Sequence, residues 1–217
     1  MKSVLVTGGT VRLGRAIAER LRAEGWRVIT SSHRADAGAD IVADLSEPMG
    51  AAKLYAAALQ MLGGLPPDAL VNNAALFTGD EAVIRAVNLE APKKLTMLMA
   101  GRETGVGAIV NILDTKALDA SRRFSTPTDA YLASKRELAA FTRSSAANFA
   151  ATLRVNAVAP GPVLAPTDVH VKAGETLLDR RPTPGDVAAA VSYLLDAEST
   201  TGVVIPVDAG QHLMSEE

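Results

Sequence analysis

Short apolar runs alternate with segments of helical length from one end of the 217-residue chain to the other. The runs are rich in Val, Leu, Ile and Ala, and polar or turn-forming residues follow most of them. This alternation is typical of a parallel sheet built from right-handed βαβ units. The expected strands are Val4–Thr7, Trp26–Thr30, Ile41–Ala43, Ala69–Val71, Ala108–Leu113, Arg154–Val158 and Val203–Val207.

Five segments between these strands are expected to be helices, because they carry apolar residues at helical spacing or many good helix formers. Thr183 is the expected N-cap of the last one, with Pro184 in its first turn. We therefore predict one α/β domain over residues 1–217, with a doubly wound, seven-stranded parallel sheet flanked by helices. The expected helices are Arg15–Glu24, Met49–Leu62, Asp80–Ala100, Thr128–Ala150 and Thr183–Leu195.

The composition excludes several classes of function. Apolar residues make up 48% of the chain and aromatic residues only 4%, so the core must consist mainly of small aliphatic side chains. The net charge is −2 and no long basic run occurs, so we expect neither nucleic acid nor a membrane as a partner. The absence of cysteine excludes disulfides, thiolate catalysis and Cys-ligated metals, and no metal site is expected. With no signal peptide or long apolar stretch, we expect a cytoplasmic protein.

A glycine-containing turn, Thr7–Gly14, separates the first strand from the first helix. Such a turn brings backbone N–H groups and the helix N-terminus against a pyrophosphate. The pattern is incomplete, because Arg12 stands where a further glycine is expected, and an ordinary strand–helix turn is the alternative. The candidate cofactor residues in this turn are Gly8, Thr10, Arg12 and Leu13.

The end of the second strand favours NADP over NAD. An NAD site has an acidic residue here for the ribose 2′-OH, whereas this chain has Ser32, His33 and Arg34. Hydroxyl and guanidinium groups suit a 2′-phosphate, which Arg12 could also reach. In the alternative, Arg34 is only solvated and Asp36 takes the acidic role.

Further cofactor candidates follow other strands. Asp44 follows the third strand and is expected to accept a hydrogen bond from the adenine amino group, with Leu45 beside it. Each position taken alone is equally consistent with ordinary turn chemistry. The residues expected around the adenosine are Asn72, Asn73, Ala74 and Ala75, and those after the sixth strand are Pro160, Gly161 and Val163.

Tyr131 and Lys135 lie four residues apart on an expected helix, so their side chains share one face. A nearby ammonium and an oxidised nicotinamide favour the phenolate, so we expect the pKa of Tyr131 to be lowered. The phenol would exchange a proton with the substrate while hydride moves, and Lys135 would also hold the nicotinamide ribose. An exposed helix face is the alternative explanation of this spacing.

Taken together, these motifs resemble the short-chain dehydrogenase/reductase family, and the resemblance covers nearly the whole chain. It implies a single Rossmann domain in which Tyr131 is the acid/base, Lys135 binds ribose and Asn88 holds a water in a proton relay. Asp114 stands where the family has its catalytic serine. The motifs are Thr7-Gly8…Gly14, Asp44, Asn72-Asn73-Ala74, Asn88, Ile109–Ile112, Tyr131-x-x-Ser134-Lys135, Arg154-Val155-Asn156, Pro160-Gly161-Pro162 and Val207–Gly210.

Arg12, His33-Arg34 and Asp114 together resemble the pteridine reductase and dihydromonapterin reductase branch of the family. That branch reduces dihydropterins or dihydrofolates with NADPH, and Asp114 would assist proton delivery by Tyr131. Phe77 and Phe124 are the aromatic residues that could stack on a pterin, although simple packing is the favoured explanation of each. The long stretch between Asp114 and Tyr131 also carries Arg122 and Arg123, and Leu164–Arg181 is a candidate flap.

Three functions remain open. The first is an NADPH-dependent reductase of a small substrate of the pterin or dihydrofolate kind. The second is a reductase or dehydrogenase of a small ketone or secondary alcohol, and the third is a non-catalytic dinucleotide-binding regulator. The resemblance also implies a homo-oligomer, a dimer or tetramer, with Asp80–Ala100 and Thr128–Ala150 at a dimer interface.

Overall fold

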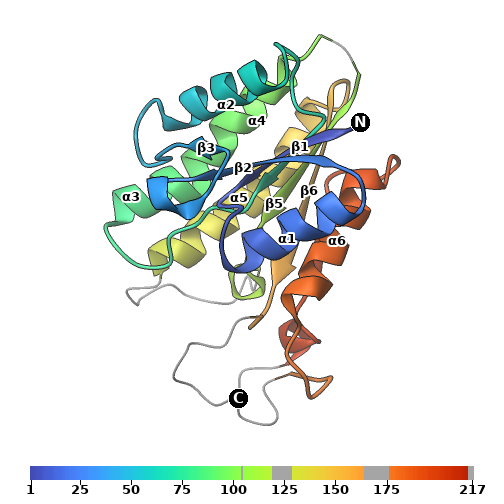
Figure 1. Ribbon diagram of the computed structural model, residues 1–217. Coiled ribbons are helices and arrows are strands. Elements are labelled where there is room, and N and C mark those ends of the chain that lie inside the picture. Colours follow the sequence, from blue (N-terminus) through green and yellow to red (C-terminus); the bar gives the residue numbers. More distant parts are fainter. Residues whose placement is uncertain (104, 119–128, 164–175, 215–217) are drawn as a thin grey trace.

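The computed structural model describes residues 1–103, 105–118, 129–163 and 176–214. Within them, seven parallel strands form one sheet in the order β3-β2-β1-β4-β5-β6-β7 (Figure 1). The predicted doubly wound, seven-stranded parallel sheet is therefore confirmed. The strands are β1 (Ser3–Thr7), β2 (Arg27–Ser32), β3 (Ile41–Val42), β4 (Ala69–Asn72), β5 (Gly107–Ile112), β6 (Leu153–Pro160) and β7 (Val204–Val207).

The strand order reverses at β1. Val4 of β1 pairs with Val28 of β2 on one side and with Ala69 of β4 on the other. The chain thus leaves β1 toward one edge of the sheet and later returns to build the other half from β4. In open α/β sheets, ligands bind in the crevice at the carboxyl ends of the strands beside such a switch point.

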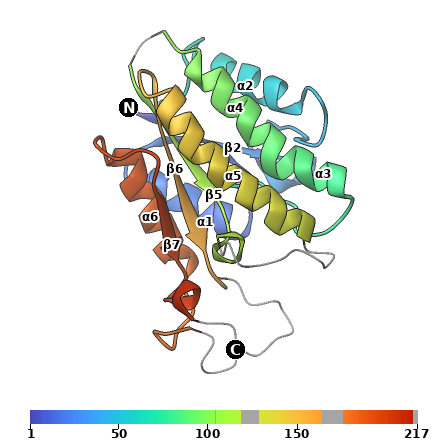
Figure 2. The ribbon, with the colours of Figure 1, turned by 180° about the vertical axis from the view of Figure 1, so that it is seen from behind.

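Helices cover both faces of the sheet (Figures 1 and 2). One face packs against α1 (Arg12–Ala23) and α6 (Pro184–Asp196), and the other against α2 (Gly50–Met61), α4 (Ala91–Ala100) and α5 (Asp129–Asn148). The side chains of successive residues in a strand point to opposite faces of the sheet. In β1, Val4 and Val6 pack in the core on the side of α1 and α6, and Leu5 packs in the core on the side of α2 and α4. All three are fully buried.

The segment expected to be one helix over Asp80–Ala100 is interrupted. It consists of α3 (Glu81–Arg85), a single π-helical segment η2 (Ala86–Glu90) and α4. Pro92 explains the change, because it has no N–H for the carbonyl of Asn88 and its ring would press on that carbonyl. The wider π turn, in which the Ala91 N–H bonds to the carbonyl of Ala86, accommodates the proline and places Asn88 in the irregular turn.

Several boundaries also differ from expectation. Helix α1 begins at Arg12 rather than Arg15, and Trp26 precedes β2 because its N–H bonds back to the carbonyl of Leu21. The predicted cap of α6 is confirmed: the Thr183 hydroxyl and the Asp186 carboxylate form a reciprocal capping box. Residues 119–128 with Arg122, Arg123 and Phe124, and the part of the expected flap at 164–175, lie outside the described residues.

Candidate active site

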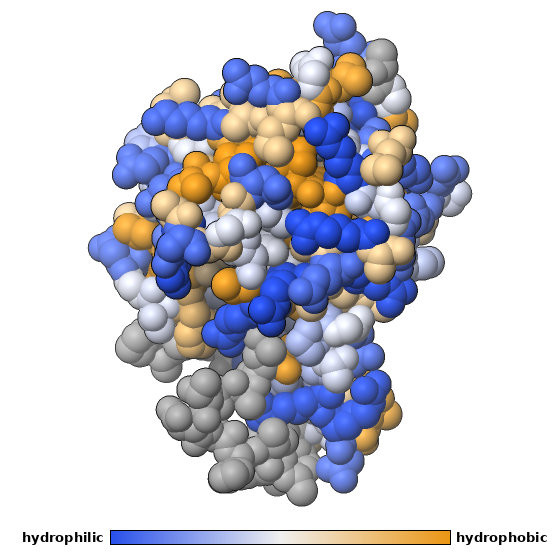
Figure 3. Space-filling view, viewed as in Figure 1, coloured by the Kyte–Doolittle hydropathy of each residue, from blue (hydrophilic) through white to orange (hydrophobic). Residues whose placement is uncertain are grey.

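One cleft of about 1430 Å³ opens at the carboxyl ends of the strands. Its described wall is formed mainly by the segments that follow β1 through β6 and by the start of α5. The outer surface of α1 beside it is mainly hydrophilic (Figure 3). Of the residues expected at the cofactor, only Asn72 is missing from the described cleft wall, which includes Gly8, Thr10, Arg12, Leu13, Ser32, His33, Arg34, Asp44, Leu45, Asn73, Ala74, Ala75, Lys135, Pro160, Gly161 and Val163.

The turn after β1 requires glycine for steric reasons. Gly8 has φ +62°, and a β-carbon at Gly14 would lie 2.0 Å from the carbonyl oxygen of Gly8. The Asn73 amide fastens the turn to β4 by donating to the carbonyls of Thr7 and Gly8 at 3.0 and 3.1 Å. No side chain caps the first turn of α1, which begins after Val11 at the cleft wall. The turn thus offers backbone N–H donors at a helix N-terminus, which fits a pyrophosphate.

The two arginines at this end of the cleft differ in their surroundings. Arg12 has φ +49°, an uncommon conformation for a residue with a side chain, and its guanidinium makes no ion pair with the described residues. Arg34 instead forms a bidentate pair with Asp36, with N–O distances of 3.0 and 2.8 Å. This pair raises the pKa of Arg34 and lowers that of Asp36. Both side chains are largely exposed, so a 2′-phosphate would compete with Asp36 for the Arg34 guanidinium.

Asp44 is held as an acceptor at the cleft wall. The Ser46 hydroxyl and backbone N–H both donate to its Oδ1, at 2.6 and 2.9 Å. The hydroxyl bond is the main reason that the pKa of Asp44 lies below its usual value. Asn72, expected beside the adenosine, is instead buried and donates from Nδ2 to Oδ1 of Asn111 at 2.8 Å. It supports the sheet and is absent from the described cleft wall.

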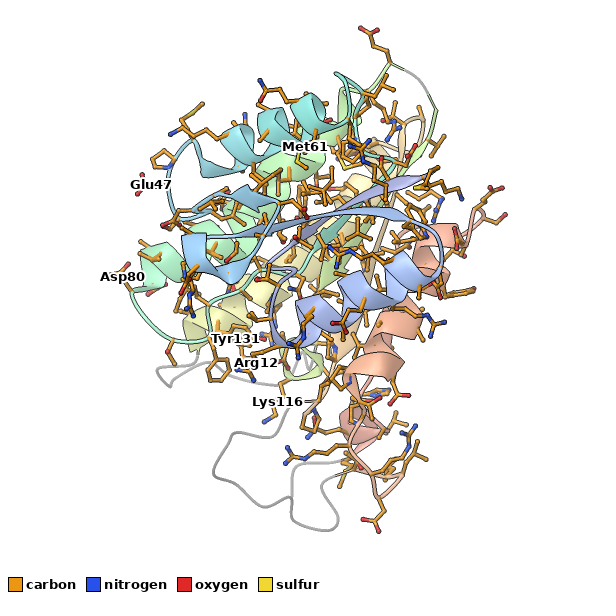
Figure 4. The ribbon with its side chains drawn as sticks, in the orientation of Figure 1. Arg12, Glu47, Met61, Asp80, Lys116 and Tyr131 are labelled. Carbon is orange, nitrogen blue, oxygen red and sulfur yellow. The ribbon has the colours of Figure 1, made fainter. Side chains whose placement is uncertain are left out.

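The predicted catalytic pair, Tyr131 and Lys135, lines the same cleft. The Tyr131 hydroxyl donates to Oδ2 of Asp114 at 3.1 Å, and Tyr131 lies at the same open end of the sheet as Arg12 (Figure 4). Lys135 is buried, and its Nζ donates to the carbonyl of Ile112 at 2.8 Å. The same Nζ lies 5.7 Å from the centre of the Tyr131 ring. The expected alternative of an exposed helix face is therefore wrong.

The surroundings of Tyr131 keep its phenol protonated. Burial raises the pKa of the phenol, and the Asp114 carboxylate raises it further by its charge and its hydrogen bond. The expected lowering of this pKa is wrong for the protein alone, because burial and a neighbouring anion oppose phenolate formation. Burial lowers the pKa of Lys135 to about 8.

Asp114 uses both carboxylate oxygens. While Oδ2 accepts the phenol, Oδ1 accepts the backbone N–H of Lys116 at 2.9 Å and so caps the 3₁₀ turn η3 (Thr115–Ala117). This local bond fixes the carboxylate immediately after β5. The position where the family has serine therefore holds an acceptor aimed at the phenol.

Asn88 lies behind the cleft wall. Its Nδ2 donates to the carbonyl of Leu76 at 2.9 Å and to the hydroxyl of Ser134 at 3.2 Å, and its Oδ1 accepts the N–H of Leu76 at 2.8 Å. Both amide hydrogens therefore have protein acceptors, so only Oδ1 has spare capacity for the predicted relay water. The direct effect of Asn88 in this structure is to hold the loop that carries Leu76.

Phe77, which the sequence analysis named as a residue that could stack on a pterin, lines the cleft. It is 58% exposed, and its ring centre lies 4.8 Å from that of Tyr131, so it packs beside the site and not in the core. The sequence analysis gave no site assignment to three other cleft residues. Lys116, Arg181 and Gln211 come from short turns whose place beside the cleft depends on the whole fold. Only the position of Lys116, two residues after Asp114, gave a local signal.

Comparisons with known proteins agree with this architecture. A protein-family profile described as "Enoyl-(Acyl carrier protein) reductase" matches residues 11–212. The granaticin polyketide synthase putative ketoacyl reductase 2 of Streptomyces violaceoruber is 33% identical over 97% of this chain and 96% of that protein. Glucose 1-dehydrogenase 2 of Bacillus subtilis (strain 168) is 29% identical, with coverage of 98% and 95%.

A similar solved structure is that of FolM alternative dihydrofolate reductase 1 from Brucella canis complexed with NADP. Its TM-score is 0.86 at 32% sequence identity, with coverage of 100% of this chain and 96% of that one. These matches confirm the resemblance inferred from the motifs, including the likeness to reductases of the pterin and folate kind. In the part of the chain that the structure describes, no helix is long and apolar enough to cross a membrane. The chain belongs to the short-chain dehydrogenase/reductase family of NAD(P)H-dependent oxidoreductases.

Proposed function

We propose that this protein is an NADPH-dependent reductase of small substrates of the dihydropterin or dihydrofolate class. The observation that carries the proposal is the hydrogen bond from Tyr131 to Asp114 in a cleft that also contains Lys135. The NADP complex of the similar FolM protein supports the same cofactor and substrate class.

The cleft divides into two ends. The uncapped N-terminus of α1 and the turn at Gly8 would hold the pyrophosphate, and His33 and Arg34 would hold the 2′-phosphate. Lys135 would hold the nicotinamide ribose, with the Pro160–Val163 segment beside the nicotinamide. When bound, NADPH supplies the hydride.

The chain itself supplies the proton. Reduction of a C=N bond adds hydride to carbon and a proton to nitrogen, so the substrate gains two electrons and both bonds form as the C=N π bond is lost. Burial and Asp114 keep the Tyr131 phenol neutral, which is the state that a proton donor needs. The buried ammonium of Lys135 would stabilise the phenolate left behind.

Phe77 gives the cleft an aromatic surface beside the proton donor. Its exposed ring is tilted by 59° to that of Tyr131 and lines the same cleft. A flat heterocycle could stack on this ring while its nitrogen faces the phenol. A small aliphatic ketone would leave the same aromatic surface in water, so Phe77 favours the heterocyclic substrate.

NADPH oxidation measured with dihydrofolate, dihydrobiopterin, diacetyl and a quinone tests the proposal. We expect turnover of a dihydropterin with a kcat/KM well above that of diacetyl. Turnover of only diacetyl or the quinone would support a carbonyl reductase instead. Tight NADPH binding without turnover of any of them would support the non-catalytic regulator.

We also propose a homo-oligomer with α4 and α5 at a dimer interface. Met97 of α4 is 54% exposed in the isolated chain, and the exposed apolar side chain would be covered in a dimer. Sedimentation equilibrium of the wild type and of Met97→Glu tests this. A monomeric wild type would contradict it.

A further inference from the structure

The described wall of the cleft is more positive than the rest of the chain. The whole protein has a net charge of −2. On the cleft wall, however, the only acidic residues are Asp44 and Asp114, and the basic ones are Arg12, Arg34, Lys116, Lys135 and Arg181. A cleft lined by one sign of charge attracts ligands of the opposite sign.

Most of these cations already have a use at the cofactor end or inside the protein. Arg34 is paired with Asp36, Arg12 belongs to the turn after β1, and Lys135 is buried against the carbonyl of Ile112. Lys116 is different: its ammonium is exposed and makes no hydrogen bond or ion pair with other described residues. It is therefore an available cation on the cleft wall.

The backbone of Lys116 is fixed relative to the proton donor. Oδ1 of Asp114 accepts its N–H at 2.9 Å, and Oδ2 of the same carboxylate accepts the Tyr131 hydroxyl. Lys116 lies at the same open end of the molecule as Tyr131, and its side chain extends outward (Figure 4). Turn η3, which carries it, also contacts the turn η4 (Gln211–Leu213), whose Gln211 lines the same cleft.

We propose that Lys116 binds a carboxylate on the tail of the substrate, so that the enzyme prefers an acidic dihydrofolate to a dihydropterin with an uncharged tail. This inference rests on the proposed dihydropterin reductase function. With the heterocycle at Tyr131, a substituent must leave the cleft through its open end, where Lys116 lies. Both oxygens of Asp114 accept hydrogen bonds from the protein. These bonds reduce the repulsion that the Asp114 carboxylate would exert on a substrate carboxylate.

The test compares dihydrofolate with dihydrobiopterin as substrates for the wild type, Lys116→Met and Lys116→Arg. Lys116→Met keeps an unbranched side chain without charge, and Lys116→Arg keeps the charge. Lys53→Met is the matched control, because Lys53 is an exposed lysine of α2 that is absent from the described cleft wall. KM is measured for each substrate at low and high salt.

We expect Lys116→Met to raise the KM for dihydrofolate by about three- to tenfold relative to its effect on dihydrobiopterin, as for a partly exposed charge-assisted contact. The salt dependence of the dihydrofolate KM should also weaken in this variant, while Lys116→Arg and Lys53→Met keep the wild-type substrate ratio. Equal effects of Lys116→Met on both substrates would overturn the inference and leave the proposed function intact. A wild type that reduces neither substrate would overturn the proposed function, and the inference with it.

Discussion

The hydroxyl of Tyr131 donates a hydrogen bond to Oδ2 of Asp114 across 3.1 Å, in a cleft that the glycine turn also lines. The carboxylate takes the position that serine occupies in the family, yet it cannot donate a hydrogen bond while ionised. Its effect is therefore exerted on the phenol: it orients the hydroxyl and raises the pKa of that group. This arrangement suits a proton donor, and so a reductase.

Tyr131→Phe removes the proposed proton donor and keeps the ring. We expect kcat for reduction of the dihydropterin to fall by about a hundredfold to ten-thousandfold, in line with loss of general acid catalysis. NADPH affinity, followed by fluorescence titration, should remain close to that of the wild type. Retained turnover would show that another group delivers the proton.

Asp114→Ser should move the pH profile of reduction. The carboxylate raises the pKa of the phenol, so its removal lowers that pKa. Reduction needs the protonated phenol, and activity is lost as the pH rises through its pKa. The alkaline fall in kcat/KM should therefore begin at a lower pH in the variant. Asp114→Asn, which removes the charge and keeps the shape, is the control, and an unchanged profile in both variants would remove Asp114 from the mechanism.

Lys135→Met should stabilise the protein without cofactor near neutral pH. Burial lowers the pKa of Lys135 from 10.5 to about 8. Below pH 8 the buried side chain is charged, and its full cost reduces the stability of the folded state. Between about pH 8 and 10.5 the unfolded chain binds a proton that the folded chain has lost, so this penalty fades as the pH rises. The free energy of unfolding in urea should exceed that of the wild type at pH 7, and the gap should narrow at pH 9.5. A constant gap would contradict a titrating lysine.

Substitutions of Arg34 and of Asp36 should change the affinity for NADPH in opposite directions. Arg34→Ala should weaken NADPH binding far more than NADH binding, because only NADPH carries the 2′-phosphate. Asp36→Asn should strengthen NADPH binding, because it releases the guanidinium from its bidentate partner. Isothermal titration of the wild type and both variants with each cofactor measures these affinities. Equal losses for NADPH and NADH in Arg34→Ala would refute phosphate recognition by Arg34.

Gly14→Ala should disrupt the turn after β1. The new β-carbon would lie 2.0 Å from the carbonyl oxygen of Gly8, so the turn must open. We expect a loss of about 1–3 kcal/mol in unfolding free energy, as for other overpacked sites, together with weaker NADPH binding. Gly185→Ala is the control, since the nearest atom, the Thr183 hydroxyl oxygen, would be 3.6 Å away. Wild-type stability in Gly14→Ala would contradict the packing.

The sequence was sufficient to predict the sheet and the position of the cleft. Apolar runs such as Val4–Thr7 are buried on both faces, and parallel strands bring the residues that follow them to one edge. That is why residues as distant as Gly8, Asp114 and Tyr131 could be expected together. The spacing of Tyr131 and Lys135 likewise depends only on helix geometry.

Features that depend on tertiary contacts could not be predicted in this way. The exposure of Phe77 depends on how its loop folds back on the sheet. The rise in the pKa of Tyr131 requires knowledge of its burial and of the orientation of Asp114. The π turn at Asn88 depends on a conflict between Pro92 and the preceding turn, which periodicity alone does not reveal.

The bonds between Asn88 and Leu76 couple the π-helical segment η2 to the loop that precedes Phe77. The position of the Phe77 ring thus depends on an amide that is absent from the described cleft wall. Substitutions in this helical segment that shift the Asn88 amide would change the orientation of the Phe77 ring, even if no residue on the cleft wall is substituted. Substrate preference in such a protein can therefore drift, in evolution or in the laboratory, through positions that a comparison of cleft residues alone would miss.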